Sequence, residues 1–160
     1  MAVPLDVADD DNVKEAAKQI IDKWGKIDLV IFNAGIYEPS EIGQLDSKTA
    51  KKVLEVNLGG AFSAVASVLP HFIENKKGHI ALVASVAGYR GLPHSRGYGA
   101  SKAGLISFAE TLRAELSSQN IKVQVINPGF VKTRLTDKND FNMPCIITCL
   151  LYTSPSPRDA

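Results

Sequence analysis

Two residues of the chain have the types and the spacing of an acid–base pair. Tyr98 and Lys102 lie four positions apart in residues 98–118, a stretch rich in Ala, Leu and Glu that predicts a helix. Residues four apart share one face of a helix, with Cβ atoms about 5–6 Å apart. A phenol, with a pKa of about 10, is a poor acid–base group at neutral pH, but a neighbouring ammonium favours the phenolate and lowers that pKa. The pair could therefore exchange a proton with a substrate oxygen, although a Tyr-x-x-x-Lys spacing alone more often marks an amphipathic surface.

Four short apolar runs predict the strands that would position this pair. They cover residues 3–7, 27–32, 79–84 and 121–126. Polar or small residues lie at the end of each run: Asp6 and Val7; Asn33, Ala34 and Gly35; Ser85; and Asn127, Pro128 and Gly129. Such residues favour turns, which is their ordinary structural role.

Helical periodicity separates these runs. Apolar residues recur at offsets of three and four between Val13 and Trp24, with Asp9 or Asp10 able to cap the start and Gly25 the end. A second helix is predicted over residues 46–75, interrupted softly at Gly59-Gly60 and closed by Lys76-Lys77-Gly78.

Strands that alternate with helices of this length predict an α/β fold with a doubly wound parallel sheet and helices on both faces. In such sheets ligands bind beyond the carboxyl ends of the strands, so the four strand ends should line a single edge.

The combined order of these motifs resembles the short-chain dehydrogenase/reductase family. The motifs are Asn-Ala-Gly at 33–35, Asn57, Ser85, Tyr98-Gly99-Ala100-Ser101-Lys102 and Pro128-Gly129, and the resemblance extends from Asp6 to about Thr133. It implies a Rossmann-like fold and an NAD(P)-dependent oxidoreductase that interconverts an alcohol and a carbonyl compound.

The resemblance also implies catalytic roles for four residues. Tyr98 would be the general acid in reduction and the base in oxidation, and Ser85 would hydrogen-bond the substrate oxygen. Lys102 would lower the pKa of Tyr98 and bind the nicotinamide ribose. Asn57 would hold a helix kink and a water that relays protons to Lys102. Without the family pattern, the simpler interpretation is that Asn57 is an ordinary polar residue of a helix and that Ser85 is a turn residue at a strand end.

Cofactor contacts are implied in the same way at the strand ends. Asp6 would accept a hydrogen bond from the adenine amino group, and the backbone of Val7 would meet the ring. Small residues at the second strand end would let the chain pass close to the cofactor, and the turn after the last strand would hold the nicotinamide. The expected cofactor-binding residues are Asp6, Val7, Asn33, Ala34, Gly35, Lys102, Pro128, Gly129, Val131 and Thr133. The loop with Tyr89, Arg90, Leu92, Pro93, His94 and Arg96 would form part of the substrate wall.

The sequence contains no glycine-rich turn of the kind that places a pyrophosphate on a helix N-terminus. We therefore expect residues 1–144 to form a partial dinucleotide-binding domain, incomplete at both ends, that binds cofactor poorly alone. The choice between NAD and NADP is not readable. Residues 145–160 resemble translated cloning sequence, and we expect a non-native or disordered tail there; a natural flexible tail is the alternative.

Composition limits the partners. A net charge of +1 supplies no basic stripe, so nucleic acid is not expected as a partner. No membrane partner is expected, because no run approaches the roughly 20 apolar residues of a bilayer span, and a cytoplasmic location is the default. Cys145 and Cys149 lack the spacing of a metal site. The expected partner is a small alcohol or carbonyl substrate, with a homo-dimer or homo-tetramer in the complete protein.

Two other functions remain open. The chain could be a noncatalytic association module that uses helices 46–75 and 98–118, where small residues would allow close packing: Ala61, Ala64, Ala66, Ala103, Gly104 and Ala109. It could also be a lyase or epimerase that uses the same tyrosine and a bound cofactor.

Overall fold

The first helix forms as its local sequence predicts. The computed structural model describes residues 1–39, 43–44, 46–140 and 142–148. Helix α1 spans Asp10–Trp24, and the Asp9 carboxylate caps it by accepting hydrogen bonds from two backbone N–H groups of the first turn. It ends at Gly25, whose φ of 77° is a left-handed conformation that glycine adopts without steric cost.

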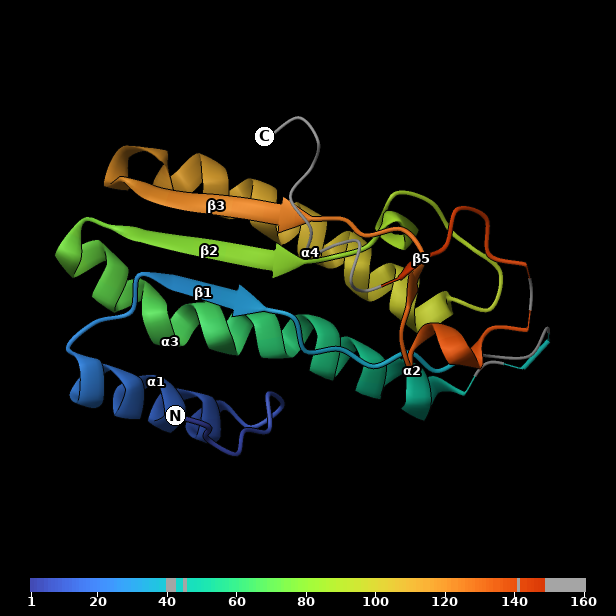
Figure 1. Cartoon of the computed structure of the whole chain (residues 1–160), viewed down its shortest axis with the longest axis horizontal. Helices are drawn as coiled ribbons and strands as arrows, with labels where there is room; N and C mark the ends of the chain where they lie inside the picture. The colour runs from blue at the N-terminus through green and yellow to red at the C-terminus, as the bar shows by residue number, and fades with distance from the viewer. Residues whose placement is uncertain (40–42, 45, 141, 149–160) are drawn as a thin grey trace.

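Three parallel strands form the main sheet (Figure 1). Strands β1 (Leu29–Phe32), β2 (Gly78–Val83) and β3 (Ile121–Ile126) lie side by side in that order. In the register, Ile80 of β2 lies opposite Val30 on one side and Val123 on the other. The predicted α/β, Rossmann-like fold with a parallel sheet is confirmed.

The strand predicted over residues 3–7 is wrong. None of these residues has strand geometry, and β1, the edge of the sheet, pairs only with β2. Asp6 instead begins a turn before α1: its carbonyl accepts from Asp9 N at 3.2 Å and its carboxylate from Ala8 N at 3.0 Å. A strand needs a neighbour for its backbone hydrogen bonds, and the described residues supply none here. Three strand ends, rather than four, therefore meet at the sheet edge.

The long predicted helices are present, with one irregularity. Helix α2 (Ser47–Leu54) continues through a π-helical turn, η1 (Glu55–Gly59), into α3 (Gly60–Asn75). The soft break expected at the paired glycines is therefore a change in helix type. Helix α4 (Arg96–Leu116) continues into a 3-10 turn, η3 (Ser117–Gln119).

Helices α1, α3 and α4 lie on the same face of the sheet, with α3 and α4 behind the strands in Figure 1. One alternate set of strand residues, which includes Phe32, Ile80 and Leu82, packs with these helices in the hydrophobic core. On the opposite face Leu29 and Ile31 are 45% and 57% exposed. Helices on that second face, which the sequence led us to expect, are not found in the described part of the chain.

The continuous helix Ser47–Asn75 has nearly the predicted bounds but is more apolar than expected. Its most apolar part has a mean hydropathy of 1.4, which by length and composition is enough to cross a membrane. Val65, Val68 and Phe72 of this helix are buried in the core, and core packing requires the same composition.

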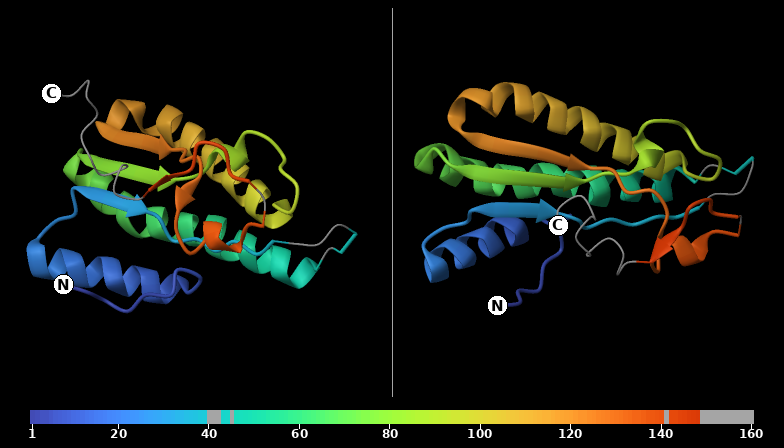
Figure 2. Two further views of the ribbon diagram at one scale, coloured as in Figure 1. Left: turned by 45° about the vertical axis from the view of Figure 1, so that its right-hand side comes forward. Right: turned by 45° about the horizontal axis from the view of Figure 1, so that its top comes forward.

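The C-terminal part of the chain crosses the open end of the sheet. A two-residue strand, β4 (Val131–Lys132), pairs in parallel with β5 (Ile147–Thr148), and the turn η4 (Thr136–Lys138) lies between them. Figure 2 shows this orange and red segment beyond the arrowheads of the main strands. Within the expected tail of 145–160, residues 147–148 thus have regular structure; residues 149–160 lie outside the described residues.

Candidate active site

The ends of β1, β2 and β3 bring the predicted motifs to one edge of the sheet. Asn33 follows β1, Ser85 follows β2 and Asn127 follows β3. The backbone N–H of Ala84 donates to Ile126 O at 2.8 Å, and that of Val86 donates to Pro128 O at 3.1 Å. These bonds hold the turn after β2 against the turn after β3, because parallel pairing continues past the last residue of each strand.

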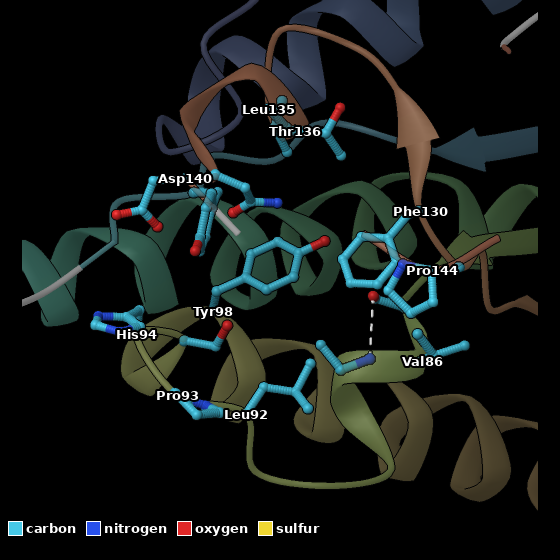
Figure 3. Close-up of a pocket in the computed structure, with 16 residues that line it drawn as sticks. Val86, Leu92, Pro93, His94, Tyr98, Phe130, Leu135, Thr136, Asp140 and Pro144 are labelled. Atoms are coloured by element: carbon cyan, nitrogen blue, oxygen red, sulfur yellow. Dashed lines mark hydrogen bonds between the residues drawn. The ribbon is translucent and has the colours of Figure 1, made fainter. Parts of the chain in front are cut away.

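Ser85 lies at the start of a short 3-10 turn, η2 (Val86–Gly88). Its hydroxyl accepts a hydrogen bond from Ala87 N at 3.1 Å, the dashed line in Figure 3. The same hydroxyl lies close enough to the phenol of Tyr98, which comes from α4, to lower the pKa of that phenol. The predicted juxtaposition of Ser85 and Tyr98 is therefore present.

Lys102 lies under Tyr98, one helical turn further along α4. Its side chain is buried, with Nζ 5.5 Å from the centre of the Tyr98 ring and donating to Val83 O at 2.8 Å. Burial penalises the charged ammonium and lowers the pKa of Lys102 to about 8. A proton on this amine is thus more labile than on an exposed lysine.

The pKa of Tyr98 moves opposite to the expected direction. Burial raises it most, the Ser85 side chain lowers it, and the neighbouring Tyr37 raises it again. The Lys102 ammonium, turned to the Val83 carbonyl, does not offset the loss of water around the phenol. Without other molecules at the site, Tyr98 is therefore a protonated group at neutral pH and a proton donor.

Asn57 is fully buried in the π-helical turn, where it joins three parts of the fold. Its Oδ1 accepts from Ile36 N at 2.7 Å, and its Nδ2 donates to Ile36 O at 2.9 Å and to Ser101 Oγ at 3.1 Å. The expected helix irregularity is present. The hydrogen bonds of Asn57 go to the loop after β1 and to α4, and the proposed water relay to Lys102 stays a prediction.

A cavity of about 500 Å³ opens in front of Ser85 and Tyr98. Figure 3 shows Tyr98 between the loop that carries Leu92 and Pro93 and the segment that carries Leu135 and Thr136. The lining residues are Tyr37, Ser85, Val86, Ala87, Leu92, Pro93, His94, Ser95, Tyr98, Gly129, Phe130, Leu135, Thr136, Asn139, Asp140 and Pro144. Most of the wall is apolar, and Ser85 and Tyr98 place two polar groups side by side in it.

The residues expected at the substrate wall divide into two groups. Leu92, Pro93 and His94 line the cavity. Tyr89 instead accepts a hydrogen bond from Asn127 Nδ2 at 2.7 Å, and Arg96 Nη1 donates to Gln44 O at 2.6 Å. These two side chains therefore contribute to loop structure outside the cavity wall.

Gly35, in the turn after β1, lies beside Lys102. A Cβ atom at Gly35 would lie 3.4 Å from Asn57 Oδ1 and 3.7 Å from Lys102 Nζ, which are ordinary van der Waals distances. At Gly129, which lines the cavity, a Cβ would meet nothing within 4 Å. Asn33, Ala34 and Gly35 share this sheet edge with Pro128 and Gly129, as the expected cofactor set requires.

The remaining expected cofactor residues lie further out and are engaged locally. Val7 packs against Gly60 of α3, where a Cβ would come within 3.0 Å of its side chain. Val131 lies in β4, and Thr133 N donates to Thr136 Oγ1 at 2.9 Å. Of the ten expected cofactor residues, Gly129 lines the cavity and the other nine do not.

Two residues that contact Tyr98, Tyr37 and Ser101, were given no role from the sequence. Tyr37 is buried, lines the cavity and packs edge-on against Tyr98, with ring centroids 5.3 Å apart. Ser101 is fully buried, accepts from Asn57 and donates to Tyr98 O at 2.7 Å. The position of Ser101, three residues after Tyr98 and one before Lys102, could have indicated that it belongs to the site. The position of Tyr37, two residues past a turn, gave no such indication.

The chain resembles known oxidoreductases over most of its length. It is 38% identical over 145 residues to an uncharacterized oxidoreductase of Myxococcus xanthus, covering 91% of this chain and 57% of the relative. It is 37% identical over 134 residues to the 3-oxoacyl-[acyl-carrier-protein] reductase FabG of Thermotoga maritima, covering 84% and 54%. The chain therefore spans about half the length of these curated relatives.

Solved structures share the fold. The structure titled "ElxO with NADP Bound" matches with a TM-score of 0.80 and 28% identity over 84% of this chain and 54% of the other. The crystal structure of gox2181 matches with a TM-score of 0.80 and 27% identity over the same shares. The family profile described as short chain dehydrogenase matches residues 1–143. With that profile spanning the sheet, the cavity and the Ser85–Tyr98–Lys102 cluster, the chain belongs to the short chain dehydrogenase family.

Proposed function

We propose that the protein containing this chain is an NAD(P)-dependent oxidoreductase that interconverts an alcohol and a carbonyl compound, with Tyr98 as the acid–base group. The observation that carries the proposal is that Ser85 and Tyr98 line the same wall of an apolar cavity, with Lys102 buried beneath the Tyr98 ring. The relatives named as oxidoreductases support the same reaction class.

The residues at the sheet edge are compatible with a dinucleotide. Asn33, Ala34 and Gly35 on one side and Pro128 and Gly129 on the other would hold it next to Lys102. Asp6 and Val7 would contact its adenine end, and Val131 and Thr133 its carboxamide. When bound, the cofactor supplies or accepts the hydride. NADP is the first cofactor to test, because the structure of ElxO was solved with NADP.

In the reduction direction the side chains of the chain supply the proton and the polar contacts. A substrate carbonyl oxygen placed between Ser85 and Tyr98 accepts hydrogen bonds from both hydroxyls, which stabilise the negative charge that develops on it. Tyr98 then transfers its proton to that oxygen and becomes a phenolate. The ammonium of Lys102, 5.5 Å from the ring centre, stabilises the phenolate electrostatically. In alcohol oxidation the same groups act in reverse.

The cavity wall favours an apolar substrate. Val86, Leu92, Phe130 and Leu135 are in contact with the space in front of Tyr98, and few polar groups line the wall near them. Burial of an apolar substrate body against these side chains would contribute binding free energy roughly in proportion to the buried area. The substrate class is therefore a small apolar alcohol or carbonyl compound.

The test is substrate-dependent oxidation of NADPH by the full-length protein, followed at the absorbance band of the reduced nicotinamide. Tyr98→Phe keeps the ring and removes the proton, and it should lower kcat by about 10²- to 10⁴-fold. Tyr89→Phe, which removes a phenol outside the cavity, is the matched control and should retain activity. Equal turnover by Tyr98→Phe and the parent would disprove the assignment of Tyr98.

A second measurement concerns the 160-residue chain alone. Because its sequence has no glycine-rich phosphate-binding turn, it should bind NADP weakly and show no turnover. Calorimetry with NADP checks this expectation, and micromolar affinity for the chain alone would contradict it.

The complete protein would assemble as a homo-dimer or homo-tetramer through α3 and α4. Phe62 of α3 is 47% exposed and packs edge-on against Phe108 of α4. Ala66, on the same helix as Phe62, and Ala103, on the same helix as Phe108, are also exposed. Ala61 and Ala109, which we expected at such an interface, are fully buried in the core and unavailable. Light scattering of the full-length protein, with Phe62→Glu as the disruptive variant, tests this assembly.

A further inference from the structure

Tyr37 lies edge-on against the proposed acid–base residue. Its ring centroid is 5.3 Å from that of Tyr98, and the two ring planes meet at 71°. Aromatic rings favour this T-shaped arrangement, because the positive edge of one ring meets the negative face of the other. Tyr37 is only 8% exposed and lines the same cavity as Tyr98.

The backbone around Tyr37 is held from two directions. The Asn57 side chain binds both the N–H and the carbonyl of the preceding residue, Ile36, at 2.7 and 2.9 Å. From the C-terminal segment, Lys138 Nζ donates to the Tyr37 carbonyl at 2.8 Å and pairs with Glu38 Oε1 at 2.8 Å. The Tyr37 ring is thus attached to a backbone that is fixed on both sides.

The hydroxyl of Tyr37 lies near the side chain of Ser95, next to the first residue of α4. Burial and the nearby Asp140 carboxylate raise the pKa of Tyr37, while Ser95 and Lys138 lower it, with a net increase. Tyr37 therefore remains a neutral phenol at neutral pH and does not compete with Tyr98 as a base.

We propose that Tyr37 is a positioning residue for Tyr98, and that Lys138 holds it in place. The Tyr98 side chain is contacted on three sides: Ser85 at its hydroxyl, Lys102 near its ring face and the Tyr37 ring beside it. Tyr37 keeps the phenol oxygen beside the Ser85 hydroxyl, where a substrate oxygen would meet both. This inference rests on the proposed role of Tyr98 as the acid–base group.

The first experiment measures the order of the Tyr98 side chain without any turnover. The chain has four tyrosines, so ring signals of ¹³C-labelled tyrosine can be assigned by single substitutions. Tyr37→Leu should lower the relaxation order parameter of the Tyr98 ring, whereas Tyr37→Phe, which keeps the ring, should leave it unchanged. Tyr89→Phe is the matched control, because Tyr89 is 63% exposed and outside the cavity.

A surface variant covers the case in which Tyr37→Leu does not fold. Lys138 has a side chain that is 42% exposed, so Lys138→Met should preserve the fold while it removes the bond to the Tyr37 carbonyl. We expect a smaller decrease in the Tyr98 order parameter. An unchanged order parameter in Tyr37→Leu, or in Lys138→Met where the former does not fold, would overturn the inference.

The second experiment measures kinetics in the full-length protein. Tyr37→Leu should lower kcat by about tenfold or more with a smaller change in KM, because small misplacements of a catalytic group are costly. Tyr37→Phe should restore kcat to within about twofold of the parent, and equal losses in the two variants would contradict a role of the ring. If the parent shows no turnover while Tyr37→Leu still loosens Tyr98, the proposed function fails and the positioning role stands.

Discussion

Asn57 binds Ile36 through both of its amide atoms, with its Oδ1 accepting from the backbone N–H and its Nδ2 donating to the backbone carbonyl. This pairing joins the π-helical turn to the loop after β1, which carries Gly35 on one side and Tyr37 on the other. Since Asn57 also donates to Ser101, one buried side chain sets the position of the expected cofactor turn relative to α4. Asn57, which the sequence presents as a single polar residue in a helix, thus links the loop after β1 to α4.

Replacement of Asn57 by alanine should destabilise the fold. The change leaves the Ile36 backbone groups without their side-chain partner in a partly buried place, and each such group costs up to about 1–3 kcal/mol. We expect a decrease of about 2–4 kcal/mol in the free energy of unfolding, measured by urea denaturation. Asn75→Ala, at the exposed end of α3, is the matched control and should stay within about 0.5 kcal/mol. A change as small as that of the control would contradict the linking role.

The elements that could be predicted from the sequence are those whose caps, periodicity and turns lie within one short segment. Helix α1 was placed with both caps, because Asp9, Gly25 and the apolar period lie within one short segment. Residues 121–126 were predicted with the observed bounds of β3, since a buried strand between clear turns also has a local signature. The run at residues 3–7 has the same signature, but a strand exists only beside a partner, and no neighbour is found for it in the described residues.

The features of the site that could not be predicted from the sequence depend on contacts between residues far apart in the chain. Tyr37 acts on Tyr98, which is 61 positions away, and is held by Lys138, a further 40 positions on; no periodicity relates these residues. The direction of the Tyr98 pKa was also missed, because it depends on the loss of water around the phenol rather than on the spacing to Lys102. The π-helical turn was visible only as a soft break at the glycines, since its geometry is stabilised by the bonds of Asn57 to distant backbone.

The stability of the chain should rise with pH above about 8 because of Lys102. Its folded pKa is about 8 and its unfolded value is 10.5, so the unfolded chain binds more protons between these two values. The penalty for charging the buried amine is fully present below pH 8 and is relieved as the pH rises toward 10.5. Urea denaturation at a series of pH values measures this slope. Lys102→Met should flatten it, whereas the exposed Lys122→Met should keep it; equal slopes in both variants would contradict the burial argument.

Gly78 should tolerate no side chain. It begins β2, and a Cβ atom at this position would overlap ring carbons of Phe72, which is fully buried and cannot move aside. Gly78→Ala should therefore lower the free energy of unfolding by about 1–3 kcal/mol, the usual cost of overpacking a core. Gly91→Ala is the matched control, because a Cβ there meets nothing within 4 Å. Thermal unfolding of the two variants makes the comparison, and similar transition temperatures would be the contrary result.

Substitutions of Ser85 should distinguish its contribution to substrate activation from its contribution to folding stability. Ser85→Ala removes the hydroxyl beside the Tyr98 phenol, so the full-length protein should lose about 10²-fold in kcat, the typical effect of one lost donor to a developing oxyanion. The hydroxyl also accepts from Ala87 N at 3.1 Å, and losing that cap should cost about 0.5–2 kcal/mol of stability. Ser85→Thr keeps a hydroxyl and should recover part of kcat. Steady-state kinetics and urea denaturation on the same samples distinguish the two effects: an activity loss that merely follows stability would show that Ser85 is a turn residue without a role in the reaction.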